Sequence, residues 1–78
     1  MINLKIASPN DTIFNGEVNK VTVKTIDGVM TLLPRHIPII SVIENGYVVI
    51  DDGDKIEILK GFITVDDSSN VSILVSHI

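Results

Sequence analysis

This chain has 78 residues, a net charge of −4 and no cysteine, so it has room for one domain and cannot use disulfides or thiolate metal sites for stability. Its six basic residues are scattered, which argues against an interface for nucleic acid and against a basic patch for a membrane surface. The apolar residues include 14 Ile and 10 Val but one Ala, and because β-branched side chains favour strands over helices, the composition predicts an all-β protein.

The first third of the chain alternates apolar runs with turn residues. Residues 2–7 alternate apolar and polar side chains, which predicts a half-buried strand that ends at the Pro and Asn of residues 8–11. A short strand is expected at residues 12–14, before an Asn-Gly pair. A longer strand is expected at residues 17–25. Within it Val18 is out of phase with the later valines, which predicts a bulge or twist near residues 19–20.

The segment that follows holds most of the unusual residues. Asp27 and Gly28 form a two-residue turn signal. In the strand after this turn, Met30 and Leu32 face one way and Leu33 faces the other. Residues 34–38 cannot form a regular ladder, because the prolines at both ends lack an N–H donor.

The second half of the chain repeats the pattern of short strand and turn. Asn-Gly, Asp-Asp-Gly-Asp, a single Gly and Asp-Asp-Ser-Ser-Asn separate the apolar runs. The whole chain, residues 1–78, is therefore predicted to be one small antiparallel β-sandwich of eight to ten short strands. In this half the strands are expected at residues 39–43, 47–50, 55–60, 62–65 and 71–76.

Three stretches of this half are apolar at nearly every position: Ile37–Ile43, Tyr47–Ile50 and Phe62–Val65. A sandwich strand needs only one apolar face. Two interpretations stay open. The second face is an exposed interaction site, or these strands are central or lie at a corner where both faces are inside.

Candidate catalytic groups are few. His36 lies between two prolines and lacks a second ligand or base of suitable spacing, so a small hydrolase or metal enzyme built on it is the least favoured hypothesis. His77 lies at the chain end and is expected to be solvated. The carboxylates at residues 51–57 and 66–67 fit hairpin turns better than a calcium loop. We expect no catalytic, cofactor-binding or metal-binding residues and no small-molecule substrate.

Targeting and membrane signals are not recognisable in the sequence. No apolar run approaches the roughly 20 residues that a membrane-spanning helix needs. The first six residues match neither a secretory signal nor a transit peptide. A soluble chain that is made where it works, without direct lipid insertion, is the expectation.

Taken together, residues 2–76 resemble the N-terminal β-sandwich of the epsilon subunit of F-type ATP synthases. The most specific part is the segment from Asp27 to Ile40, which resembles the family's acidic-Gly, aliphatic, Leu-Pro-x-His-x-Pro-aliphatic signature. Shorter matches support it: Leu4-Lys-Ile, Ser8-Pro-Asn, Phe14-Asn-Gly-Glu-Val, Asn45-Gly46 and Gly61-Phe62.

The resemblance implies a non-catalytic rotor subunit in the central stalk of an ATP synthase. In this family the sandwich binds the gamma subunit, rests on the membrane-embedded ring of c subunits and supports the coupling of ion flow to ATP synthesis. The implied location is peripheral, at the cytoplasmic face of the bacterial inner (plasma) membrane. The alternative is a free-standing β-sandwich module that binds a protein or another ligand.

Contact residues are also implied by the resemblance. The loop around Gly28 and the loop at residues 33–38 correspond to regions that face the c-ring and gamma. Val29 stands where the family often has an acidic residue, so a charge contact is not expected there. The family commonly continues into two regulatory helices, and with the chain stopping at Ile78 we expect no inhibitory function from it. The expected subunit contacts are Asp27, Gly28, Val29, Met30, Leu33, Pro34, Arg35, His36 and Pro38.

Overall fold

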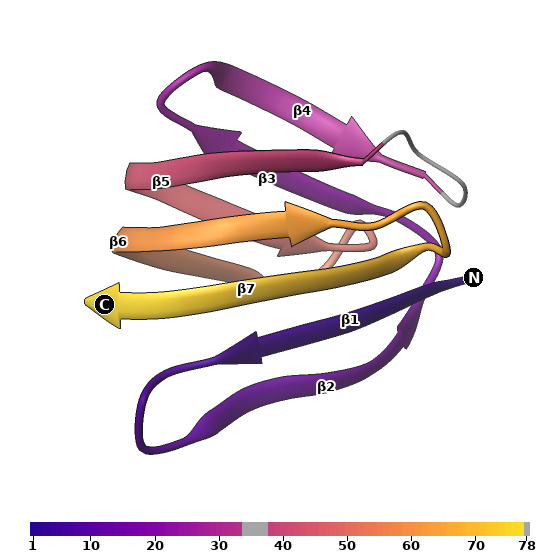
Figure 1. The fold of residues 1–78 in the computed structure, drawn as a ribbon, viewed down its shortest axis with the longest axis horizontal. Coiled ribbons are helices and arrows are strands. Elements are labelled where there is room, and N and C mark those ends of the chain that lie inside the picture. The colour runs from indigo at the N-terminus through magenta and orange to yellow at the C-terminus, as the bar shows by residue number, and fades with distance from the viewer. Residues whose placement is uncertain (34–37, 78) are drawn as a thin grey trace.

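The computed structural model describes residues 1–33 and 38–77, and these residues form an all-β fold (Figure 1). Within this part of the chain there are seven strands and no helix. The all-β prediction is therefore confirmed, whereas the expected eight to ten short strands are replaced by seven, some of them long. The strands are β1 (Ile2–Ala7), β2 (Thr12–Val18), β3 (Val21–Thr25), β4 (Gly28–Leu32), β5 (Ile39–Ile50), β6 (Lys55–Val65) and β7 (Asn70–His77).

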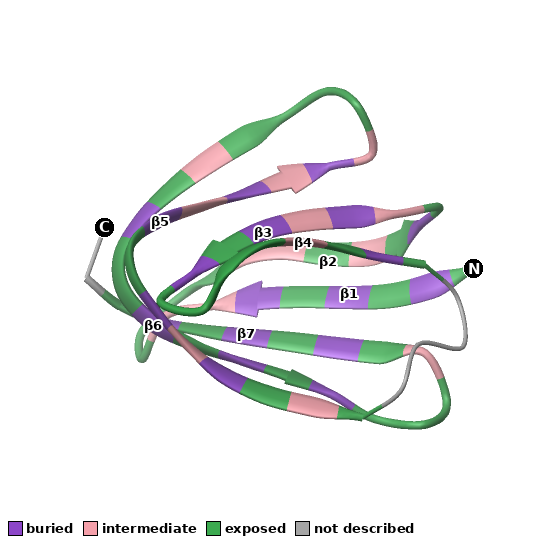
Figure 2. Cartoon of the chain, turned by 90° about the horizontal axis from the view of Figure 1, so that it is seen from above, coloured by how far each residue is buried: buried purple, intermediate pink, exposed green. Residues whose placement is uncertain are grey.

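All seven strands belong to one sheet, in the order β2-β1-β7-β6-β5-β3-β4. Every neighbouring pair is antiparallel except β1 and β7, which run parallel. The sheet curls over itself, so that β3 lies behind the layer that holds β1, β7 and the later part of β6 (Figure 1). The long strands β5 and β6 run through the curl and belong to both layers of the sandwich (Figure 2).

The core lies between the two layers and is made of aliphatic side chains. In β1, Ile2, Leu4 and Ile6 are buried and their neighbours point outward, as the alternation predicts. The same holds in β7, where Val71 pairs with Leu4 and Ile73 pairs with Ile6. This close packing of β-branched residues supplies the stability that a chain without disulfides needs. Figure 2 shows the resulting alternation of buried and exposed residues along these strands.

The strand breaks expected at Asn15-Gly16, Asn45-Gly46 and Gly61 are wrong, because continuous strands run through all three. At Gly46 and Gly61 the glycine allows another backbone to approach closely. β2 passes through Asn15-Gly16, and β5 passes through Asn45-Gly46. A Cβ on Gly46 would clash with the carbonyl oxygen of Lys24 on β3. In β6, a Cβ on Gly61 would lie 2.6 Å from the carbonyl oxygen of Leu74. Glycine thus lets the backbones approach where the sheet bends.

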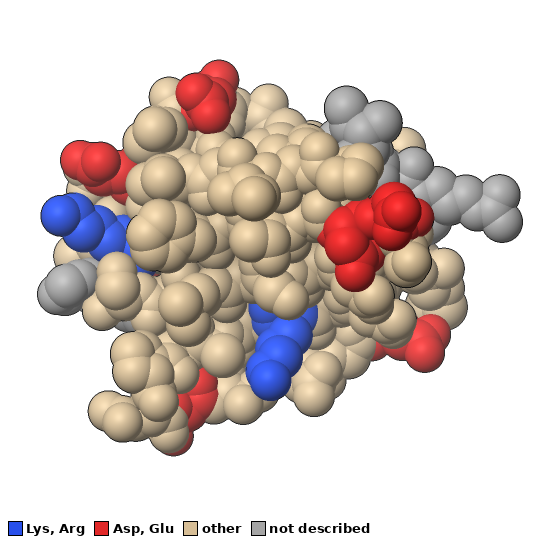
Figure 3. All heavy atoms as spheres, in the orientation of Figure 1, with Lys and Arg blue, Asp and Glu red and all other residues tan. Residues whose placement is uncertain are grey.

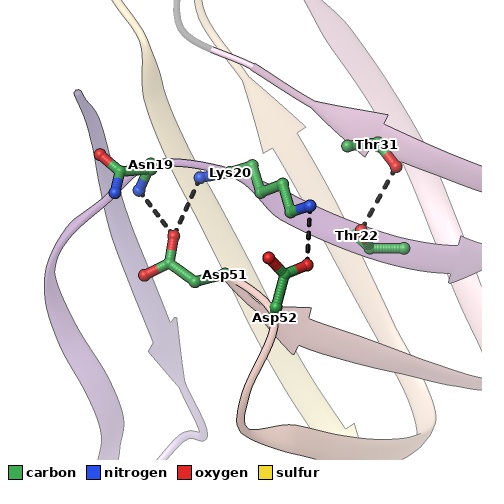
Figure 4. A network of polar contacts seen from close by, with 6 residues as sticks. All are labelled: Asn19, Lys20, Thr22, Thr31, Asp51 and Asp52. Atoms are coloured by element: carbon green, nitrogen blue, oxygen red, sulfur yellow. Dashed lines mark hydrogen bonds and ion pairs between the residues drawn. The ribbon is translucent and has the colours of Figure 1, made fainter.

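A further correction concerns residues 17–25, which do not form one bulged strand. β2 ends at Val18 and β3 begins at Val21, and both valines are buried. Between them the backbone N–H groups of Asn19 and Lys20 donate to Oδ1 of Asp51, at 2.8 and 3.2 Å (Figure 4). A side chain far away in the sequence therefore satisfies the donors that a continuous ladder would have used.

Candidate protein-interaction surface

The turn between β3 and β4 is built by side chain to backbone hydrogen bonds. The backbone N–H of Asp27 donates to Oγ1 of Thr25 at 3.1 Å, and that hydroxyl donates to the carbonyl oxygen of Gly28 at 3.3 Å. Gly28 has a φ of 117°, a conformation that side chains disfavour. The two central residues are Ile26 and Asp27, so the turn lies one residue earlier than the Asp-Gly pair predicts.

This turn is fastened to the beginning of β5. Oδ2 of Asp27 accepts a hydrogen bond from Oγ of the buried Ser41 at 3.0 Å. The backbone N–H of Ile26 donates to the carbonyl oxygen of Val42, also at 3.0 Å. Both central turn residues are therefore held against β5, while the side chains of Ile26 and Val29 stay 59% exposed. Apolar side chains are thus presented to solvent on a rigid support.

Beside the turn, apolar side chains form a row across three neighbouring strands. Val42 on β5 pairs with Phe62 on β6, and Phe62 pairs with Leu74 on β7. Ile40 lies two residues before Val42 and therefore points to the same side of the sheet. Ile40 is 81% exposed, and Phe62 and Leu74 are each 51% exposed. We call Ile40, Val42, Phe62 and Leu74 the outer apolar surface.

Charged side chains lie mostly around this surface rather than on it. In Figure 3, which looks onto the layer of β5, β6 and β7, uncharged side chains fill the upper and central area. Carboxylates lie toward its margins, and a basic side chain crosses its lower part. An apolar centre with a charged rim is the composition of a protein-protein interface. The second face of the doubly apolar strands is exposed at Ile40 and Phe62 and half-buried at Tyr47 and Val49, so neither is fully covered within this chain.

The contact residues expected from the sequence fall into three groups. Met30 is half-buried, and Pro34, Arg35 and His36 lie outside the described residues. The others are exposed where the structure describes them: Asp27, Gly28, Val29, Leu33 and Pro38.

Sequence reasoning missed Leu74 as a surface residue. The strand that holds it alternates cleanly, which suggests an ordinary solvent-facing side. The available signal was an apolar residue at an outward position, between Ser72 and Ser76. Ile40 and Phe62 were within strands already noted as apolar on both faces.

The acidic turns have structural partners. Asp51 caps the N–H groups at the β2–β3 break. Asp66 accepts hydrogen bonds from the side chain of Asn70 and from the backbone N–H groups of Asn70 and Ser68, which lower the pKa of its carboxyl. Among the described residues, no group of three or more acidic or imidazole side chains has the geometry to hold a metal ion. Nor does this part of the chain contain a helix long and apolar enough to cross a membrane.

Comparisons with known proteins agree with this architecture. Residues 1–78 match the family model of the ATP synthase delta/epsilon chain, beta-sandwich domain. The ATP synthase epsilon chain of Halalkalibacterium halodurans is 30% identical over 74% of this chain and 44% of its own length. That of Leptospira borgpetersenii is 33% identical over 97% of this chain and 61% of its own length.

A solved structure supports the fold. A chain in the central stalk and c-ring structure of the Tetrahymena thermophila mitochondrial ATP synthase superposes with a TM-score of 0.83. The match covers 96% of this chain and 63% of that chain, at 14% sequence identity, so it shows a shared fold.

The chain spans about half the length of the epsilon chains it matches, between 44% and 61% in the two relatives above. The match of the family model over all 78 residues and the identity to epsilon chains nevertheless agree on one assignment. The expectation of a non-catalytic subunit accords with it. This chain belongs to the family of ATP synthase delta/epsilon chain β-sandwich domains.

Proposed function

We propose that this chain is a central-stalk rotor subunit of an F-type ATP synthase, where it binds the gamma subunit and rests on the c-ring. The membership in the delta/epsilon family supports this role. So does the fold that it shares with a chain of the Tetrahymena central stalk. In this role the chain transmits torque between the ring and gamma and so supports the coupling of ion flow to ATP synthesis.

The observation that carries the proposal is the outer apolar surface. Ile40, Phe62 and Leu74 expose more than half of their side chains on one side of the sheet. Leaving such side chains in water is unfavourable by about 25 cal/mol for each Å² of apolar area, so a permanent partner gains stability by covering them. A stalk subunit has such a partner throughout its working life.

The support beneath this surface suits the transmission of force. Phe62 and Leu74 belong to β6 and β7, which are paired over six positions. The β3–β4 turn is bonded to β5 through Asp27 and Ile26. A load applied to the turn therefore passes into the sheet through hydrogen bonds rather than through a loose loop.

The location follows from the role. A subunit that contacts the c-ring lies at the cytoplasmic face of the bacterial inner membrane, as a peripheral member of the complex. Its contact with the membrane is then made through the ring, without lipid insertion of its own. We further propose that residues 1–78 act as one folding unit, since all seven strands share one sheet.

Two measurements test the role. The chain, mixed with the gamma subunit of the same organism at micromolar concentration, is expected to elute as a one-to-one complex in size-exclusion chromatography. Membrane vesicles from cells without the chain are expected to lose ion-driven ATP synthesis. A failure to form the complex, together with intact coupling in those vesicles, refutes the proposal and leaves a free-standing binding module as the better account.

A further inference from the structure

In the described part of the chain the sheet has two edge strands, β2 and β4, and they differ in their protection against pairing with another chain. Natural edge strands carry charges, prolines or register shifts that prevent such pairing. β2 has a register shift in its pairing with β1 and carries the exposed Glu17. β4, with the sequence GVMTL, has no charge, no proline and no register shift.

The backbone groups on the open side of β4 can be assigned from the register. Lys20 and Ile26 direct backbone groups toward β5, because the carbonyl oxygen of Lys20 accepts from Asp51 and the N–H of Ile26 donates to Val42. Alternation then turns the odd-numbered residues of β3 toward β4.

Their partners in β4 are Gly28, Met30 and Leu32, which therefore bond to β3. Val29 and Thr31 are left with their N–H and C=O groups directed to the open edge. The contact of 3.3 Å between the hydroxyls of Thr22 and Thr31 fits this register, since side chains lie closest in pairs that exchange no backbone bonds.

We propose that an extended segment of the stalk partner pairs with the open edge of β4 and adds a strand to the sheet. This is the same partner that covers the outer apolar surface. This inference rests on the proposed function and names how the partner is held. The occupant is an extended strand whose backbone N–H and C=O groups form hydrogen bonds with those of Val29 and Thr31.

Two observations select this occupant. The edge begins at the β3–β4 turn, which is bonded to Val42 of the outer apolar surface, so a partner on that surface lies beside the edge. A second copy of this chain fits less well, because two copies that each carry a net charge of −4 repel one another.

Amide hydrogen exchange tests the inference in the wild-type protein. The amides of Val29 and Thr31 are expected to exchange at least tenfold more slowly in the complex with gamma than in the free chain. The amide of Met30, which bonds to β3, serves as the internal control because it is protected in both states. Unchanged exchange at Val29 and Thr31 in a complex that does form overturns this inference while the proposed function stands.

The remaining outcomes are also decisive. If no complex with gamma forms, this inference fails, and intact coupling in the vesicle measurement then refutes the proposed function as well. If protection at Val29 and Thr31 appears in the free chain and grows with its concentration, a second copy occupies the edge and the inference is wrong.

A pair of variants gives an independent test. Thr31→Pro removes an outward N–H that the fold does not use and is expected to weaken the complex about tenfold. Thr31→Val keeps the N–H and removes the hydroxyl, and its affinity is expected to match the wild type. Equal affinity of both variants contradicts strand addition. If Thr31→Pro does not fold, the exchange measurement in the wild type decides.

Discussion

The carboxylate of Asp51 accepts the backbone N–H of Asn19 at 2.8 Å, across 32 positions of sequence. The same oxygen accepts the N–H of Lys20, and the ammonium of Lys20 forms an ion pair of 2.7 Å with Asp52 (Figure 4). The turn between β5 and β6 is thereby fixed to the connection between β2 and β3. Asp51 itself has a φ of 53°, which Asp and Asn tolerate better than most residues.

Replacing Asp51 is expected to destabilise the fold because two backbone donors lose their acceptor. Asp51→Ala is expected to lower the free energy of unfolding by about 1–3 kcal/mol, and Asp51→Asn by less, since an amide oxygen still accepts. Urea denaturation followed by circular dichroism measures both. The control is Asp52→Ala, which removes only an exposed ion pair and is expected to cost less than about 1 kcal/mol. Equal effects at both positions argue against a capping role for Asp51.

A methyl group added at Gly46 is expected to be among the most disruptive single changes in the described sheet. Its Cβ would clash with the carbonyl oxygen of Lys24, which backbone pairing holds in place. We expect Gly46→Ala to cost about 3 kcal/mol or more in thermal or urea unfolding. In Gly53→Ala, by contrast, the added Cβ would lie 3.8 Å from the carbonyl oxygen of Ile50, an ordinary contact, so little change is expected. Comparable stability of the two variants contradicts the close approach.

The Asp66 turn is expected to respond to acid. Hydrogen bonds from the side chain of Asn70 and from the N–H groups of Asn70 and Ser68 lower the pKa of the Asp66 carboxyl below its ordinary value of 3.8. Because the folded pKa is depressed, this carboxylate stabilises the fold above pH 3.8 and the contribution is lost as the pH falls through the folded pKa. A carbon-detected NMR titration is expected to give a midpoint for Asp66 below that of the same residue in a peptide of residues 64–72. A midpoint equal to that of the peptide contradicts the network.

One cooperative unfolding transition is expected for residues 1–78. β1 and β7 come from opposite ends of the chain and pair directly, so neither end separates without breaking the sheet. The ring absorption of Tyr47 and the far-ultraviolet circular dichroism of the strands are expected to give the same thermal midpoint. Two distinct midpoints contradict a single folding unit.

Local pattern was sufficient for part of the fold. The strands β1 and β7 are half-buried, so alternation of apolar and polar residues identified them and their inward faces. Gly46 and Gly61 misled the prediction because their role is set by Lys24 and Leu74, which approach from other strands. The residues around a glycine do not show which other strand approaches it, and the Asn45-Gly46 pair also favours a turn.

The sequence could indicate a candidate interaction surface, but it could not identify all the residues that form it. Strands that are apolar on both faces left open whether the second face is exposed or inside, and at Ile40 and Phe62 it is exposed. The register that aligns Val42, Phe62 and Leu74 in one row depends on strand pairing, which sequence pattern alone did not give. The carboxylate of Asp51 was assigned to an ordinary turn for the same reason, because its partners lie on another connection.

The affinity for the gamma subunit, measured by isothermal titration calorimetry, tests the central claim most directly. The double variant Phe62→Asp and Leu74→Asp places two charges on the outer apolar surface and is expected to weaken binding at least about thirtyfold. The matched control is Leu59→Asp, a residue that is 53% exposed on β6 before the register shift at Lys60 and Gly61. Our account predicts tight binding by the wild type and the control and a large loss in the double variant. Unchanged affinity of the double variant would contradict it.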